Sequence, residues 1–96
     1  MVIGILQLEL VIHDATNLKD KRRIVMSLKD RLHREHRVAV AEVDRLDAHQ
    51  TAVLGIAAVS NSPAHVQSVL DRIVDEVKSN GRVVLNDYHT EVIRGR

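Results

Sequence analysis

The sequence predicts a single α+β domain whose elements follow the order strand, helix, strand, strand, helix, strand. Three observations predict it. Hydrophobic residues alternate or cluster in four short segments, and they recur with helical spacing in two longer ones. The length of 96 residues gives room for one hydrophobic core and is too short for two domains. Neither a low-complexity stretch nor a Gly/Ser linker divides the chain, so residues 1–96 are expected to form one domain.

Residues 2–12 are predicted to form the first strand, because hydrophobic side chains take most of the even positions while Gln7 and Glu9 lie on the other face. The first helix is expected from Leu18 to about Glu35, where the hydrophobic residues recur every three or four positions. Asn17 precedes this helix as an N-cap, which defines where the helix begins.

The middle of the chain is predicted to form a hairpin. Val38–Asp44 and Thr51–Ser60 are rich in Val and Ala, and a short polar segment joins them. A second helix then begins at Ser62-Pro63, a cap residue followed by proline at the first helical position. We expect it to end at Asn80-Gly81, with the glycine in the left-handed conformation. Arg82–Ile93 is the predicted last strand.

This order is typical of the ferredoxin-like β-α-β-β-α-β sandwich, an antiparallel four-stranded sheet with two helices on one face. The other face of such a sheet is open and should be polar. Here its first strand includes Ile3, Ile5 and Val11, and the third strand is hydrophobic on both faces. We therefore expect part of the open face to be covered, most simply by a second subunit in a homo-oligomer. The alternative is that the pattern of one short strand is misleading and that the open face lies in solvent.

Charged residues are unevenly distributed, although the formal net charge is only +1. Eight basic and three acidic residues fall between Lys19 and Arg37, a balance of +5, and the rest of the chain has a balance of −4. A helix surface with this excess of positive charge attracts phosphates over about 8–10 Å. The alternative is a solvated helix face, with Asp30 and Arg34 as an i,i+4 ion pair. The candidate nucleic-acid contacts are Lys19, Lys21, Arg22, Arg23, Lys29 and Arg34.

Lys21 differs from the other basic residues in its place on the helix. At 100° per residue it lies at about 60°, inside the hydrophobic stripe that includes Ile24, so its ammonium must reach an edge or an acidic partner. The hairpin lies at the same end of the domain and includes Asp44, Asp47 and His49. We predict that Lys21 approaches Asp44 or Asp47 in a structural ion pair. A catalytic role for this hairpin-end cluster is the less favoured alternative.

The six histidines do not converge on a metal site by their spacing. His33 and His36 are three residues apart on a helix, a weak ligand spacing, and no H-E-x-x-H motif is present. The absence of Cys excludes disulfides, thiol catalysis and Cys-ligated metals. There is no glycine-rich phosphate loop and no nucleophile elbow. The sequence therefore predicts no catalytic residue, no metal site and no cofactor.

No hydrophobic run reaches the roughly 18 residues of a membrane span, and no secretory signal pattern is present. We therefore expect a cytoplasmic protein that does not associate with membranes. Tyr88 is the one aromatic residue, so a platform of aromatic rings for stacking bases is absent.

Three blocks in the chain resemble the YlxP-like family of small bacterial proteins, which is classed as a domain of unknown function. They are Leu18–Leu28 (LKDKRRIVMSL), Val40–Asp44 (VAEVD) running on to Asp47–Gln50 (DAHQ), and Leu54–Asn61 (LGIAAVSN), and the match covers nearly the whole chain. The resemblance implies a ferredoxin-like fold. Genes of the family often lie beside genes for translation initiation and ribosome maturation, which implies, by association, a role near the ribosome or its RNA.

The sequence departs from the family pattern at two positions. Asp20 stands where the family usually has Glu, and His49 stands where the hairpin usually has Trp. The second change removes the aromatic residue most suited to stacking on a base or a partner. The family's characteristic positions correspond here to Lys19, Lys21, Arg22, Glu42, Asp44, Asp47, Gln50, Gly55, Ser60 and Asn61.

The most favoured function is a non-enzymatic protein that binds RNA or a ribosomal particle, with the basic first helix on phosphates. A homo-oligomeric scaffold or a small-ligand module that uses the open sheet face is the alternative. An enzyme that uses Lys21 with the hairpin-end cluster is a third hypothesis, and it requires a pocket at that end of the domain.

Overall fold

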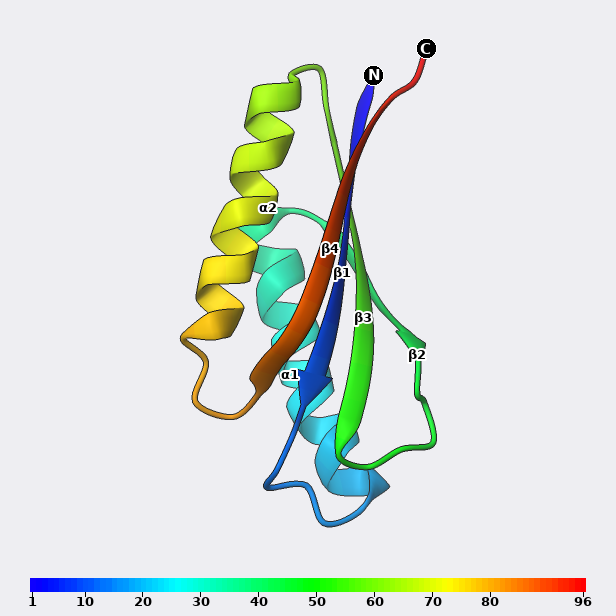
Figure 1. Cartoon of the computed structure of the whole chain (residues 1–96), viewed down its shortest axis with the longest axis vertical. Helices are drawn as coiled ribbons and strands as arrows, with labels where there is room; N and C mark the ends of the chain where they lie inside the picture. Colours follow the sequence, from blue (N-terminus) through cyan, green and yellow to red (C-terminus); the bar gives the residue numbers. More distant parts are fainter.

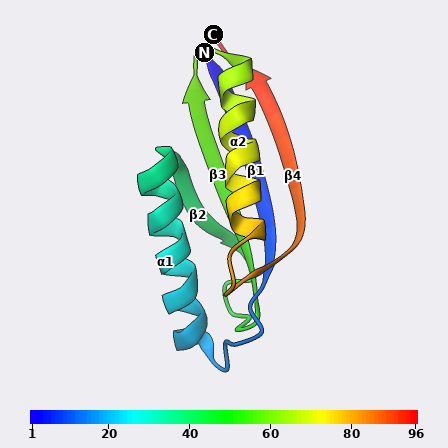
Figure 2. The ribbon, with the colours of Figure 1, turned by 90° about the vertical axis from the view of Figure 1, so that its left-hand side faces the viewer.

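The computed structural model describes residues 1–96, and its strands form one antiparallel sheet in the order β2-β3-β1-β4 (Figure 1). Both helices cover the same face of this sheet, in front of it in Figure 2. This arrangement confirms the ferredoxin-like sandwich. The elements are β1 (Val2–Val11), α1 (Leu18–His36), β2 (Ala39–Asp44), β3 (Thr51–Ser60), α2 (Pro63–Lys78) and β4 (Val84–Arg94).

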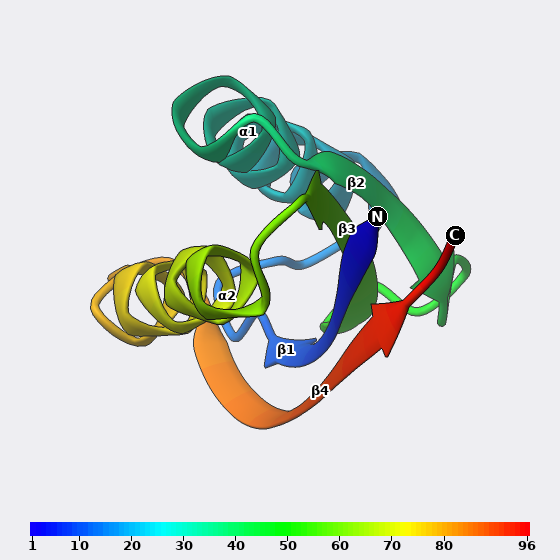
Figure 3. The same ribbon diagram turned by 90° about the horizontal axis from the view of Figure 1, so that it is seen from above.

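The hydrophobic core lies between the sheet and the helix layer, which Figure 3 shows from above. The even positions of β1 are buried because they face the helices, and Leu6 and Leu8 are fully inaccessible. The hydrophobic stripe of each helix is buried against them. At Gly4 the second helix comes so close that a Cβ would overlap Val66 Cγ1, so this position requires glycine.

The two helices lie over different parts of the sheet. The first helix packs beside β2, and α2 packs over β1 and β4 (Figure 2). The molecule is elongated, with extents of 44 × 23 × 22 Å. The helices approach each other where His36, at the end of α1, meets Glu76, near the end of α2.

The C-terminal end of α2 differs from the prediction. No glycine has a positive φ, so the expectation that Gly81 adopts the left-handed conformation is wrong. The last turn is closed instead by Ser79, whose hydroxyl donates to the carbonyl oxygens of Asp75 and Glu76 at 3.2 and 3.0 Å. A left-handed residue caps α1, where Arg37 has φ 55° and donates its N–H to His33 O at 3.0 Å.

The register of the central strands is unbroken, whereas both edge strands shift. All ten residues of β1 pair in step with β3. The pairing of β2 with β3 shifts between Glu42 and Asp44, which leaves Val43 as an extra residue. The pairing of β1 with β4 shifts between Glu9 and Leu10. Because of this bulge, Asp44 pairs with Val53, whereas Glu42 pairs with Leu54 on the face that the helices cover.

Candidate functional site

The first turn of α1 is fixed by three neighbouring polar residues. Asn17 has extended backbone angles, and its side-chain oxygen accepts the N–H of Asp20 at 2.9 Å. The hydroxyl of Thr16 donates to the Asp20 carboxylate at 2.7 Å, and the backbone N–H of Thr16 donates to the same oxygen at 3.3 Å. These two hydrogen bonds hold the pKa of Asp20 below its ordinary value, and the nearby charges of Arg23 and Lys19 lower that pKa further. The helix therefore begins at a defined place.

The basic residues of α1 form a cationic surface on the side away from the sheet. We call the set Lys19, Arg22, Arg23, Lys29 and Arg34 the basic surface; Lys29 is half-buried, and the other four side chains are exposed. No ion pair joins any of these five residues to an acidic group, including the expected pair of Asp30 and Arg34. The surface ion pair that α1 does form is Arg31–Glu35, at 3.7 Å. The basic side chains of this surface are thus not engaged in direct ion pairs, although Asp20 lies close enough to Arg23 and Lys19 for their charges to act on its carboxylate.

Two further basic residues lie beside this surface, and of these only Arg82 lies outside the basic segment that the sequence indicated. Arg37 lies beside Arg34 and His33 around an open hollow of about 670 Å³ at the end of α1. Arg82, from the segment before β4, lies beside Arg23 around a smaller hollow of about 220 Å³. Arg82 was missed because sequence separation hides its approach to α1.

Lys21 is fully buried and lies against the hairpin, not in solvent. Its Nζ lies 2.7 Å from Glu42 Oε2, and it donates to the carbonyl oxygens of Arg45 at 2.7 Å and Ala48 at 2.6 Å. Two hydrogen bonds and one ion pair thus surround the ammonium. The hairpin was the right partner, whereas the expected approach to Asp44 or Asp47 is wrong. Glu42 is the partner because it pairs with Leu54 on the face that the helices cover.

This geometry removes Lys21 from the candidate phosphate contacts, because a buried ammonium with three partners cannot reach a nucleic acid. Asp44, Asp47 and His49 are exposed and do not converge on it. The Asp44 carboxylate accepts the N–H of Arg45 at 2.7 Å. None of the five cavities is lined by Lys21 or by these three residues. A hollow of about 120 Å³ does lie at the hairpin end, with Arg45 and Thr51 in its lining, but the residues of the hypothesised active site do not contribute to it.

A second tie joins the hairpin to the loop before α1. The side-chain amide of Gln50 donates to the carbonyl oxygen of Ala15 at 3.3 Å, and the carbonyl oxygen of Gln50 accepts the N–H of Ile12 at 2.8 Å. Together with Lys21, these bonds make the hairpin a support for the start of α1.

The open face of the sheet has a hydrophobic half over β2, β3, the first residues of β1 and the end of β4. Val59 is 68% exposed, and Ile5 and Ile93 are 37% and 38% exposed. A groove of about 440 Å³ runs between β2 and β1, with Val43 and Gly55 among its lining residues. A Cβ at Gly55 would lie 2.9 Å from Val43 Cγ1, because the bulge tilts Val43 over the groove floor.

The other half of the open face is polar. Asp87, His89 and Glu91 of β4 stand opposite Glu9, Gln7 and Ile5 of β1 in the register. His89 Nε2 lies 3.5 Å from Asp87 Oδ2, and both side chains are exposed. A second subunit would therefore need to bury only the hydrophobic half of this face.

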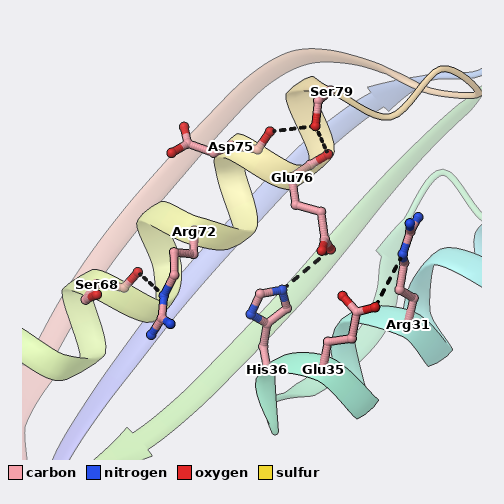
Figure 4. A network of polar contacts seen from close by, with 8 residues as sticks. All are labelled: Arg31, Glu35, His36, Ser68, Arg72, Asp75, Glu76 and Ser79. Carbon is pink, nitrogen blue, oxygen red and sulfur yellow. Dashed lines mark hydrogen bonds and ion pairs between the residues drawn. The ribbon is translucent and has the colours of Figure 1, made fainter.

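A buried pair of polar groups joins the ends of the two helices (Figure 4). His36 Nε2 lies 3.5 Å from Glu76 Oε2, and the two side chains are 14% and 26% exposed. Both atoms are buried and have no hydrogen-bond partner. One donor atom from each of Glu35, His36 and Glu76 lies within 4.8 Å of the other two. His33 is not part of this cluster, because its Nδ1 lies 2.8 Å from Val38 O.

No helix of the structure is both long enough and apolar enough to cross a membrane. A family model described as "Protein of unknown function (DUF503)" matches residues 3–90. The chain is also similar to "Uncharacterized protein YlxP" of Bacillus subtilis (strain 168), at 32% identity over 78 residues that cover 81% of this chain and 85% of that protein.

Among solved structures, the chain is similar to the de novo designed protein LFR1 1, which has a ferredoxin fold and was determined by solution NMR. The TM-score is 0.52 at 15% identity, over 99% of this chain and 88% of the designed one. At that identity the likeness concerns the fold alone.

Proposed function

We propose that this chain, which belongs to the DUF503 family of proteins of unknown function, is a non-enzymatic cytoplasmic protein that binds RNA or a ribosomal particle through the basic surface. One observation carries the proposal. Five basic side chains project from one helix and none of them forms an ion pair with an acidic side chain of the chain. A cationic surface of this kind is suited to a phosphate backbone.

The dimensions of α1 support contacts with several phosphates. Lys19 and Arg34 are separated by about 22 Å along the helix axis, at 1.5 Å per residue. The helix is held rigidly at its start by Lys21 and Glu42, so its basic side chains are displayed from a fixed axis. Tyr88 lies on β4, with the Lys78 ammonium 5.5 Å from its ring centroid, and is therefore remote from this surface. Recognition should rest on phosphates and shape and not on stacked bases.

The test is the salt dependence of binding to a ribosomal RNA fragment, measured by fluorescence anisotropy. Five phosphate contacts predict a slope of log K against log salt of about −3.5 to −4.5. The variant Arg22→Ala/Arg23→Ala should bind more weakly at every salt concentration, with a slope shallower by about 2. The matched control is Arg94→Ala/Arg96→Ala, which removes the same charge at the far end of β4. Binding that ignores salt, or that falls equally in both variants, would reject the proposal.

The open sheet face supports a second candidate function, a homo-oligomeric scaffold. The observation that favours it is the hydrophobic half of that face, where Ile5, Val59 and Ile93 are exposed beside the groove. Light scattering should then give at least a dimer, and Ile5→Asp/Val59→Asp should give a monomer. Met26→Asp is the control, because Met26 is 61% exposed on α1 and lies away from the sheet. A strict monomer at high protein concentration contradicts this candidate.

A further inference from the structure

We infer that His36, Glu76 and Glu35 form a binding site for a divalent transition-metal ion of the Zn²⁺ class, between the C-terminal ends of α1 and α2. The two buried donor atoms, His36 Nε2 and Glu76 Oε2, have no hydrogen-bond partner. One donor atom from each of Glu35, His36 and Glu76 lies within 4.8 Å of the other two. Buried polar atoms are normally satisfied, and the one contact of these two atoms is the long 3.5 Å separation from each other, which leaves room for a ligand between them.

The distance between the two buried donors fits a metal ion better than a hydrogen bond. Hydrogen bonds from nitrogen to oxygen measure about 2.7–3.2 Å, and His36 Nε2 and Glu76 Oε2 are 3.5 Å apart. Two ligands bound to one Zn²⁺ at about 2.0–2.2 Å, in tetrahedral geometry, are about 3.4 Å apart. One ion can therefore take both donors without a displacement of either helix.

Glu35 completes a set of three ligands from two helices. It precedes His36 at the end of α1, and its side chain is on the same side as the histidine in Figure 4. Its present partner is Arg31, whose Nε is 3.7 Å away, a long surface contact that a cation would replace. Because Glu35 is exposed, an ion and a water ligand can approach the cluster from the side of this residue.

The donor set selects the class of ion. One imidazole nitrogen and two carboxylates suit Zn²⁺ and its neighbours, whereas Mg²⁺ and Ca²⁺ prefer oxygen ligands alone. A protonated His36 in a long ion pair with Glu76 is the competing arrangement, and it would exclude the ion. The two arrangements differ in a measurable way, because only the first takes up Zn²⁺.

The experiment is calorimetric titration of the metal-free full chain with Zn²⁺, with circular dichroism of each variant as the check on folding. Wild type should bind about one ion per chain. His36→Asn and Glu76→Gln should each lower the affinity at least about tenfold, since the loss of an outer-shell partner of a metal site costs about 10–100-fold. Glu35→Gln should also weaken binding, and it cannot threaten the fold because Glu35 is exposed.

The matched control is His89→Asn. His89 and Asp87 show the same 3.5 Å separation, but both side chains are exposed and no third ligand is near them. This variant should retain the wild-type affinity. In ¹H–¹⁵N spectra of the imidazoles, Zn²⁺ should shift the His36 ring signals. The proposal is overturned by equal binding to wild type and to all three ligand variants, or by no saturable binding at micromolar Zn²⁺.

Discussion

Lys21 of α1 and Glu42 of β2 form an ion pair of 2.7 Å beneath the start of the helix, and no part of the lysine is accessible to solvent. Two backbone carbonyl oxygens of the hairpin complete the coordination of the ammonium. Glu42 Oε2 accepts no hydrogen bond and is held by this ion pair alone. Each charge is therefore compensated almost entirely by the other and by the hairpin backbone.

Lys21→Ala should destabilise the protein strongly, because it leaves Glu42 buried without its partner. Loss of one partner of a buried ion pair costs about 3–5 kcal/mol. The double variant Lys21→Met/Glu42→Leu should be markedly more stable than Lys21→Ala, since it leaves no unpaired charge. Urea unfolding of the three proteins measures both effects. A loss below about 1 kcal/mol in Lys21→Ala would show that the pair is solvated.

Gly4→Ala should destabilise the protein, because the new Cβ overlaps the side chain of Val66 in α2. Overpacking of this kind costs about 1–3 kcal/mol. Gly81→Ala is the matched control: nothing lies within 4 Å of its Cβ position and its φ is not positive. That change should be neutral or stabilising by up to about 1 kcal/mol. Thermal unfolding tests the contrast, and equal melting temperatures would contradict it.

Asp20 should contribute to the loss of stability in acid. Its pKa in the folded protein lies below its ordinary value of 3.8, because Thr16 donates two hydrogen bonds to the charged form. Its contribution is therefore fully present above that ordinary pKa and is lost as the pH falls through the lowered pKa. Asp20→Asn should be less stable than wild type at neutral pH, and the difference should shrink below about pH 4. Urea unfolding across this range tests it; a difference that grows in acid has the wrong sign.

Arg82→Ala should weaken RNA binding although Arg82 lies outside the basic surface. It sits beside Arg23, so its charge adds to the potential at the start of α1. The salt slope should become shallower by about 1. Arg72→Ala on α2 is the comparison, because Arg72 is exposed and bonds only within its own helix. Anisotropy titrations at several salt concentrations measure both slopes. Indistinguishable effects of the two variants would place the contact elsewhere.

Periodicity was sufficient for the order and type of all six elements, because each strand or helix keeps its own hydrophobic spacing. The burial of Lys21 also followed from its angle on the helical wheel. Its partner did not, since Glu42 and Asp44 are two residues apart and the bulge at Val43 intervenes between them. The predicted role of Gly81 at the end of α2 was wrong, because Ser79 closes the last turn before the chain reaches Gly81.

The pair of His36 and Glu76 shows what spacing along one helix cannot reveal. His33 and His36 offered the visible pattern, yet His33 is engaged with Val38 at the end of α1. The actual neighbour of His36 comes from the second helix, and the approach of α1 to α2 is a property of the folded sheet beneath them. Arg82 was missed for the same reason.

The register shifts in the two edge strands also bear on how the protein meets copies of itself. The free edges of β2 and β4 expose backbone N–H and C=O groups that could pair with a strand from another molecule. On β2 the bulge interrupts that row after only a few residues, and on β4 a second shift breaks it near Asp87. The long, regular ladder of β1 and β3 is enclosed between them. Fibril growth by edge-to-edge strand addition is therefore opposed at both sides of the sheet.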